Sequence, residues 1–180
     1  MSKLTAAPSQ SRKSKLSEMF VRADKMSDRG QLRDAFRLFL AAAKAGDKAS
    51  QLNVGCFYDE GKGVRRNRSA ALYWYKRAYR RGDASAANNI GTIWRDENNS
   101  QRALSWFRRA VKLGSDDSNL EIAKHYLQNE RDLGRAVPYL NKVCRSDRVT
   151  EDSAEEAKQL LQETMRRLKE SNSGRRVAQT

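Results

Sequence analysis

The sequence predicts an all-α fold: a right-handed α-α superhelix, or solenoid, of about four helix-turn-helix repeats with a C-terminal capping helix. The first observation behind this prediction is a phrase that recurs as AFRLFLAAAKAG (35–46), ALYWYKRAYRRG (71–82) and ALSWFRRAVKLG (103–114). The glycines that end the phrase lie 36 and 32 residues apart. Self-similarity at this period is typical of helical repeat arrays, which present extended surfaces to other macromolecules.

The second observation is that apolar residues recur at spacings of three and four, which places them on one face of a helix. In the second repeat we expect a first helix over 49–60 and its partner helix over 67–81. Gly55, Gly91 and Ala123 occupy equivalent positions in the first helices. Because glycine costs a helix roughly 1 kcal/mol relative to alanine, we expect these small residues to let two helix backbones approach closely.

The third observation concerns the ends of the predicted helices. Each recurring phrase ends in a glycine, a residue that adopts the left-handed conformation that satisfies the last carbonyls of a helix. The residues that follow these glycines are suited to cap the next helix, and they are Asp47, Asp83 and Ser115. The turn inside the repeat runs over 61–67 in the second repeat and shortens to 96–100 in the third. This shortening explains the smaller offset between the later phrases.

The chain divides into four segments on these grounds. Residues 1–15 and 171–180 are basic, lack apolar periodicity and are expected to be disordered tails. Residues 16–148 are expected to form the helical repeats, and residues 149–170 the capping helix.

Two local features of the later helices carry their own expectations. A capping box of Ser153 and Glu156 is expected to open the C-terminal helix. This helix either covers the open end of the solenoid or docks on a second copy or a partner. Pro138 is expected in the first turn of its helix, or else to bend it.

The chain is strongly basic. Its 180 residues include 36 Lys and Arg against 22 Asp and Glu, which gives a formal net charge of +14. This balance favours an acidic partner, either nucleic acid, an anionic membrane surface or an acidic protein surface, although such charge also serves simply to keep a protein in solution. The sequence has no run of about 20 apolar residues that would cross a membrane and no secretory signal, so a cytoplasmic location is expected.

The sequence offers no group of residues suited to catalysis, and we expect no catalytic, cofactor-binding or metal-binding residue. His125 is the single histidine, and Cys56 and Cys144 fall in different repeats, so no zinc-site spacing arises. Reduced, packed cysteines are the simplest interpretation. The G-x-G-V sequence at 61–64 lacks the Gly-Lys-Ser/Thr ending of a phosphate loop. The chain is therefore not expected to be an enzyme.

The second repeat carries a combination of residues that is found in a known family. Residues 52–83 combine a glycine and a tyrosine in the first helix, a G-x-G-V turn, and alanine, aromatic, alanine and glycine in the second helix. These residues are Gly55, Tyr58, Gly61, Gly63, Val64, Ala71, Trp74, Tyr75, Ala78 and Gly82. The pattern resembles the Sel-one-like repeat (SLR) family of the tetratricopeptide (TPR)-like superfamily, over about residues 16–146.

The resemblance implies a non-enzymatic adaptor or scaffold that binds one or more proteins of unknown identity. The alternative is an accessory module that binds nucleic acid or another anionic surface through a basic stripe on the outer helices. The third repeat lacks the G-x-G-V turn and the fourth lacks the final glycine. These departures leave the number of complete repeats and the curvature open.

Two candidate surfaces follow from the predicted repeats. In the resembled superfamily the first helices line the concave side, so the candidate protein contacts are Leu52, Asp59, Asn88, Thr92, Arg95, Lys124 and Leu127. The second surface is the basic stripe, whose aligned columns are Arg77, Arg109 and Lys142, and Lys44, Arg80, Lys112 and Arg145. Phosphate contacts would make binding by this stripe strongly salt-dependent. A solvated outer face with ordinary surface charge is the competing interpretation.

Overall fold

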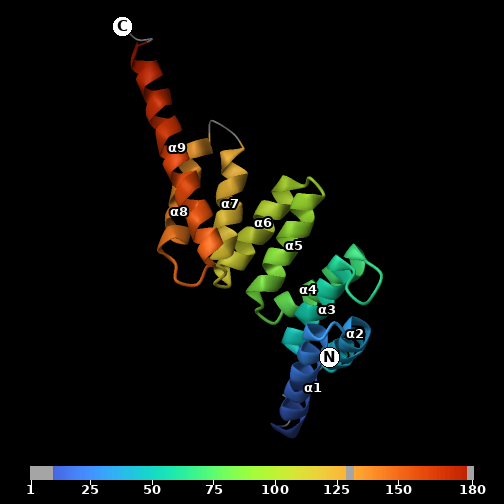
Figure 1. Ribbon diagram of the computed structural model, residues 1–180. Coiled ribbons are helices and arrows are strands. Elements are labelled where there is room, and N and C mark those ends of the chain that lie inside the picture. Colours follow the sequence, from blue (N-terminus) through green and yellow to red (C-terminus); the bar gives the residue numbers. More distant parts are fainter. Residues whose placement is uncertain (1–9, 129–131, 178–180) are drawn as a thin grey trace, which may run out of the picture. The chain divides into compact units, whose positions relative to one another are not determined.

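The computed structural model describes residues 10–128 and 132–177, and Figure 1 shows helices joined by short connections. In chain order the helices of these parts are α1 (Gln10–Asp28), α2 (Leu32–Lys44), α3 (Lys48–Glu60), α4 (Arg68–Tyr79), α5 (Ala84–Asp96), α6 (Ser100–Lys112), α7 (Asp117–Leu127), α8 (Leu133–Arg145) and α9 (Glu151–Val177). No strand occurs in these two stretches. The predicted all-α repeat architecture is therefore confirmed.

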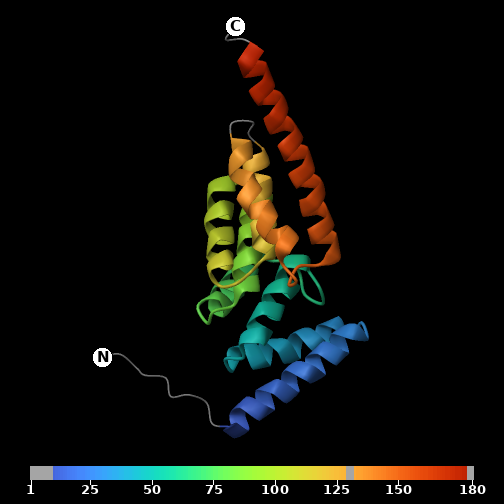
Figure 2. The same ribbon diagram turned by 90° about the vertical axis from the view of Figure 1, so that its left-hand side faces the viewer.

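The helices form two compact units, with the boundary between Ala86 and Ala87 inside α5. In the first unit α1 packs against α2, α2 against α3, and α3 against α4. In the second unit α6 packs against α7, α7 against α8, and α9 against both α7 and α8. Figure 2 shows α1 and α2 (blue) side by side, and α9 (red) beside α8 (orange). Within each unit, helices that follow one another along the chain are thus also neighbours in space, as in a repeat array.

Aromatic rings from three helices fill the core of the first unit. Phe39 of α2 makes edge-to-face contacts with Phe20 of α1 and Phe57 of α3, with the ring centroids 5.6 Å apart in both pairs. Phe36, also on α2, stacks on Phe57 at 6.0 Å and meets Tyr58 edge-on at 5.2 Å. Such pairs contribute about 0.5–1.5 kcal/mol each beyond the area that they bury. These contacts fix α2 between α1 and α3.

The core of the second unit is closed by α9. Buried apolar residues from α6, α7 and α8 form one cluster, which Ala157 of α9 joins. Leu160 and Leu161 of the same helix pack against this cluster and are partly buried. The fully buried Thr164 donates its hydroxyl hydrogen to the carbonyl of Leu160 at 2.6 Å, so its polar group is satisfied within the helix. The apolar stripe of α9 therefore lies against α7 and α8.

In two repeats an aromatic ring of the second helix lies directly against the glycine of the first helix. A Cβ atom at Gly91 would lie 2.6 Å from the ring of Phe107, and a Cβ atom at Gly55 would overlap the ring of Tyr75. The sequence predicts a close approach of two backbones at these glycines, whereas the atoms nearest to them belong to a ring. A flat ring reaches close-packed contact with a helix backbone only where no side chain intervenes.

The turn between α3 and α4 depends on two glycines with positive φ. Gly61 (φ 75°) ends α3, and Gly63 (φ 65°) lies where a Cβ atom would be 2.5 Å from the backbone carbonyl of Leu32. The turn therefore packs closely on the first residue of α2. After the turn, the side chain of Asn67 accepts a hydrogen bond from the backbone N–H of Ala70 at 3.0 Å and caps α4.

The other predicted helix ends are largely confirmed. Asp47 and Asp83 each accept a backbone N–H hydrogen bond from the helix that follows, at 2.6 and 2.9 Å. Ser115 reaches the N–H of Ser118 only at 3.4 Å, and the residue at the cap position of α7 is Asp116, whose side chain makes no capping bond. The predicted left-handed residues have φ values of 102°, 79° and 93°, at Gly46, Gly82 and Gly114.

The first helix begins earlier than predicted. α1 starts at Gln10, so residues 10–15 are helical and are not part of a disordered tail. They contain neither glycine nor proline, and Arg12 donates from Nη2 to the carbonyl of Ala45 at 3.2 Å. This contact ties the first turns of α1 to the end of α2. The rest of the predicted N-terminal tail, residues 1–9, lies outside the described residues.

The last helix differs from the prediction at both ends. α9 continues through residues 171–177, because each residue added to an existing helix gains a hydrogen bond without a new nucleation step. At its start, Thr150 Oγ1 accepts a hydrogen bond from the N–H of Ser153 at 3.2 Å. The predicted capping box of Ser153 and Glu156 is therefore wrong, since an earlier hydroxyl residue caps the helix. Residues 178–180 of the predicted tail lie outside the described residues.

Pro138 lies inside α8, beyond the first turn that begins at Leu133. Of the two predicted alternatives, a place in the first turn is therefore wrong, and a bend in α8 stays a prediction. Proline has no N–H to donate to the carbonyl four residues earlier, which belongs to Gly134. The helix tolerates this loss because its buried residues, among them Ala136 and Leu140, hold it in the core.

The ring-on-glycine contact predicts the stability of two matched variants. In Gly91→Ala the new methyl group would collide with Phe107, so we expect the free energy of unfolding to fall by about 1–3 kcal/mol, which exceeds the gain in helix propensity. Gly134→Ala is the control, because no atom lies within 4 Å of a Cβ atom there. This control should leave stability unchanged or raise it slightly. Urea unfolding of both variants checks the prediction, and equal stabilities would contradict it.

Candidate interaction surfaces

In the last three repeats the second helices lack acidic residues. The second helices α4, α6 and α8 contain no Asp or Glu, and they carry Arg68, Lys76, Arg77, Arg102, Arg108, Arg109, Lys112, Arg135, Lys142 and Arg145. The first helices α3, α5 and α7 each carry at least one carboxylate. The stretch from Gly61 to Gly82 can be seen in the sequence to lack acidic residues. The same absence in α6 and α8 becomes clear only when the bounds of these helices are known. The second helices therefore form the basic part of these three repeats, whereas α2, the second helix of the first repeat, carries Asp34.

One predicted column of the basic stripe lies on aromatic rings of its own helix. Each cation sits over the ring three residues earlier, one helical turn back. The distances from the cation to the ring centroid are 5.3 Å for Arg77 and Trp74, 4.4 Å for Arg109 and Trp106, and 5.7 Å for Lys142 and Tyr139. Such contacts stabilise exposed sites by about 0.5–1 kcal/mol. This column therefore has a structural role, while its charges still face the surface.

The other predicted column lies at the ends of helices. Its cations are the last helical residue of α2, α6 and α8 and the C-cap residue of α4, which are Lys44, Lys112, Arg145 and Arg80. A cation at a helix C-terminus interacts favourably with the helix dipole, by about 0.3–1 kcal/mol. All four side chains are exposed, and none forms an ion pair with a residue in 10–128 or 132–177. Their charges are thus available to a partner.

The two columns meet in shallow hollows, one in each unit. On α4 a hollow of about 300 Å³ is lined by Gln51, Tyr73, Arg77, Arg80 and Arg81. On α6 a hollow of about 310 Å³ is lined by Gln101, Leu104, Ser105, Arg108, Arg109 and Lys112. Three lining positions are equivalent in the repeat, because Tyr73, Arg77 and Arg80 align with Ser105, Arg109 and Lys112. We call these the α4 hollow and the α6 hollow.

The predicted concave contacts of the second unit bond to neighbouring helices. Asn88 of α5 accepts a hydrogen bond from the hydroxyl of Ser118 at 2.8 Å. Arg95 forms an ion pair with Glu121 of α7, and Lys124 pairs with Glu156 of α9 at 2.8 Å. The remaining predicted contacts are half-buried, and they are Leu52, Asp59, Thr92 and Leu127. Three of the predicted contacts thus help to join helices of successive repeats.

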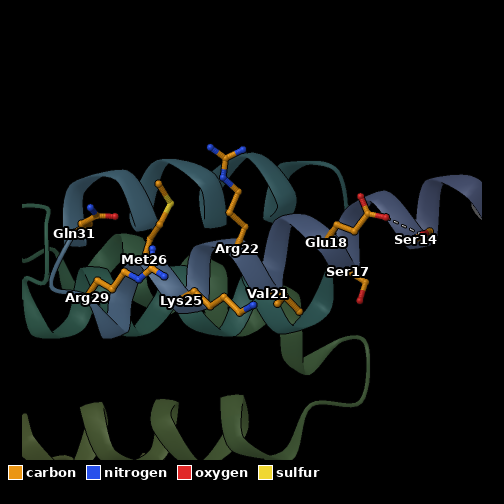
Figure 3. Close-up of a pocket in the computed structure, with 9 residues that line it drawn as sticks. All are labelled: Ser14, Ser17, Glu18, Val21, Arg22, Lys25, Met26, Arg29 and Gln31. Atoms are coloured by element: carbon orange, nitrogen blue, oxygen red, sulfur yellow. Dashed lines mark hydrogen bonds between the residues drawn. The ribbon is translucent and has the colours of Figure 1, made fainter.

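A further hollow lies on the outer face of α1. It measures about 690 Å³ and is lined along α1 by polar, basic and apolar side chains, with Gln31 at its end (Figure 3). Val21 contributes an exposed apolar surface, and Glu18 accepts a hydrogen bond from Ser14 at 3.2 Å. Figure 3 shows the Glu18 carboxylate turned toward Ser14 and away from Arg22. Unlike the α4 and α6 hollows, this one contains a carboxylate of its own.

The repeats match a known family. Residues 28–47, 48–83 and 84–115 fit the family model described as the Sel1 repeat. The chain carries Sel1 repeats. Most of α1 and the helices α7, α8 and α9 lie outside the matched segments, so the resemblance read from the sequence is confirmed for its central part. Sel1 repeats are generally protein-interaction modules, and their scaffolds are typically non-catalytic.

Two known proteins are similar to part of this chain. The putative sel1-like repeat-containing protein L21 of Acanthamoeba polyphaga mimivirus is 29% identical over 104 residues, which are 58% of this chain and 18% of that protein. Chitin synthase regulator SKT5 of Saccharomyces cerevisiae is 30% identical over 94 residues, 48% of this chain and 14% of that protein. This chain therefore spans less than a fifth of either relative.

A solved structure shares the fold. The crystal structure of a Sel1 repeat protein from Oxalobacter formigenes superimposes with a TM-score of 0.60 at 29% identity. The match covers 72% of this chain and 52% of that chain. The paired-helix architecture described above is thus that of solved Sel1 repeats.

Little in the Sel1 repeat chain is suited to catalysis. The described residues contain no group of three or more His, Cys, Asp or Glu side chains that could hold a metal ion. Partial burial and the nearby Arg108 lower the pKa of His125, whose ring lies against Tyr126. Burial raises the pKa of the Cys56 thiol, which keeps it protonated and poorly nucleophilic. No helix within residues 10–128 or 132–177 has both the length and the apolarity to cross a membrane.

The ion pairs between the first helices predict a measurable stability effect. Glu121 pairs with both Arg95 and Lys124, and its side chain is only 18% exposed. Glu121→Gln should therefore lower the free energy of unfolding by about 1 kcal/mol, and added salt should reduce the difference from the unmodified protein. Glu155→Gln removes an exposed pair with Lys158 and should change stability by less than about 0.5 kcal/mol. Equal effects of the two variants in thermal unfolding would contradict this prediction.

Proposed function

We propose that this chain is a non-enzymatic adaptor that binds one or more proteins through its repeats. The observation that supports the proposal is the run of Sel1 repeats over residues 28–115, a module that generally serves protein interaction. The residues that define the repeat are used in packing, as when Gly91 receives the ring of Phe107 and Gly63 packs on Leu32. Residues that select a partner must therefore lie among the exposed side chains that the fold does not need.

The exposed face of the second helices is the better supported contact surface. Asn88, Arg95 and Lys124 of the first helices bond to residues of neighbouring helices. Arg80 and Lys112, in contrast, are exposed and form no ion pair within residues 10–128 and 132–177. Exposed cations without a partner are not needed to hold the fold, so they are available for recognition.

A second candidate function is the binding of nucleic acid or another anionic surface. The observation that favours it is the absence of Asp and Glu from α4, α6 and α8, combined with the net charge of +14. A protein that binds phosphates with its cations loses affinity steeply as salt rises.

Affinity capture with and without nuclease tests both candidates. The tagged full chain is incubated with an extract from its source cells, and the captured proteins are identified by mass spectrometry. We expect partner proteins that remain after nuclease treatment and that are absent from a capture with a heat-unfolded sample. Partners that disappear with the nuclease would contradict the adaptor function and favour nucleic acid binding. An empty capture under both conditions would contradict the adaptor function as well.

A further inference from the structure

We infer that the α4 hollow binds the carboxylates of an acidic segment of a partner protein, and that the equivalent α6 hollow binds a similar segment. This inference rests on the proposed adaptor function and specifies the chemistry of its partner. It is carried by the geometry of the two hollows, by the absence of acidic residues from their linings, and by their occurrence at equivalent positions in separate units.

The cation of the α4 hollow is held in place before any partner arrives. The guanidinium of Arg77 lies 5.8 Å from the ring centroid of Tyr73 and 5.3 Å from that of Trp74. Its Nη1 also donates a hydrogen bond to the Tyr73 hydroxyl at 3.0 Å. These contacts limit the rotamers of a long side chain, so less conformational entropy is lost when it binds a ligand.

The floor of the hollow is formed by a buried polar side chain. Gln51 is 1% exposed and donates from Nε2 to the carbonyl of Ala43 at 3.2 Å. Its Oε1 atom has no hydrogen-bond partner among the described residues. Arg80 and Arg81 complete the lining together with Tyr73 and Arg77. The site is thus lined by three arginines, of which Arg77 has its guanidinium held over aromatic rings.

No carboxylate lines this hollow to neutralise its charge. The chain from Gly61 to Gly82 contains eight basic residues and no Asp or Glu, and the lining itself contains none. Close cations of like charge repel one another, and an incoming carboxylate relieves this repulsion. Guanidinium groups also bind carboxylates through paired, charge-assisted hydrogen bonds. The ligand that the α4 hollow fits best is therefore an anion with carboxylate geometry.

The α6 hollow repeats this arrangement in the second unit. Arg109 lies 4.4 Å from the ring centroid of Trp106, and Arg108 donates from Nη2 to the hydroxyl of Tyr126 at 2.7 Å. Lys112 is exposed and forms no ion pair with a described residue. The helix α6 also has no acidic residue. Two units that pack independently thus carry a fixed cation beside an unpaired one.

The surroundings favour an acidic protein segment over nucleic acid. Proteins that bind single-stranded nucleic acid stack bases on open aromatic faces. Trp74 is only 6% exposed, and the guanidinium of Arg109 covers Trp106. The more exposed ring of Tyr73 has the guanidinium of Arg77 over it, 5.8 Å from its centroid. The hollow also presents an acceptor, the hydroxyl oxygen of the exposed Tyr73. A peptide brings backbone N–H donors beside its carboxylates, whereas a phosphodiester backbone carries only acceptors.

Fluorescence anisotropy with defined probes tests the inference on the full chain. The probes are a labelled peptide of alternating glutamate and glycine, its glutamine counterpart, and a labelled oligothymidylate. We expect the glutamate peptide to bind at low salt, and the glutamine peptide and the oligothymidylate to bind at least about tenfold more weakly. Arg77→Gln with Arg80→Gln should weaken binding of the glutamate peptide about tenfold. Arg109→Gln with Lys112→Gln should likewise weaken binding of the glutamate peptide.

The matched control removes the same charge from a different surface. Arg22→Gln with Lys25→Gln changes two cations that line the hollow on α1, in the same unit as the α4 hollow. This control should weaken binding of the glutamate peptide less than about twofold, because long-range attraction between charges is largely screened by salt. Circular dichroism melting confirms that each variant is folded. Arg80→Gln alone provides a variant that breaks no described contact, and it should still weaken binding severalfold.

Three results would overturn the inference. The first is equal weakening by the α1 control and the α4 variant, which would show a general charge effect. The second is tighter binding of the oligothymidylate than of the glutamate peptide, which would favour nucleic acid as the ligand. The third is no binding of the glutamate peptide while nuclease-resistant partner proteins are still captured. That result would overturn this inference alone. If neither binding of the glutamate peptide nor a captured partner protein were found, the adaptor function would be overturned as well.

Discussion

The repeat depends on one packing constraint. A ring from the second helix packs on a residue of the first helix that has little or no side chain. Gly91 makes room for Phe107, and Gly55 makes room for Tyr75. A glycine inside a helix costs about 1 kcal/mol, so the contact must be worth more than the lost helix propensity. In the first and last repeats the equivalent small residues are alanines, Ala23 and Ala123, and both are fully buried.

This packing also determines what the outer face of the second helices presents. Tyr75 and Phe107 lie in the core, and the residues just before them are Trp74, which is also buried, and the less buried Trp106. A cation one turn later lies over each of these two tryptophan rings. Part of the basic stripe is thus a consequence of helix geometry. The remaining part, which includes Arg80 and Lys112, meets no need of the core and supports a role in recognition.

Prediction from the sequence succeeded where local patterns were decisive and failed where two local patterns competed. Asp47 and Asp83 were correctly expected as caps because each follows a helix-ending glycine. Ser153 was expected to cap α9, but Thr150 is an equally good capping residue and lies earlier. Only the packing of the helix against its neighbours selects between such equivalents. The prediction of concave contacts failed to account for the same effect. A side chain that would be exposed in a single repeat contacts the neighbouring helix once the next repeat is present.

The sequence by itself determined the repeat, the positions of the helices, the left-handed glycines and the basic character of α4, because these depend on residue type and on spacing along one segment. Only the tertiary structure decided that Arg95 bonds to Glu121, 26 residues away, and that Lys124 bonds to Glu156, 32 residues away. It likewise decided that Arg77 and Arg80 line one hollow with Gln51. The physical reason is that side chains distant in sequence meet only when helix packing fixes which helix faces lie together. The repeat pattern alone does not specify the side chains that lie between neighbouring helices.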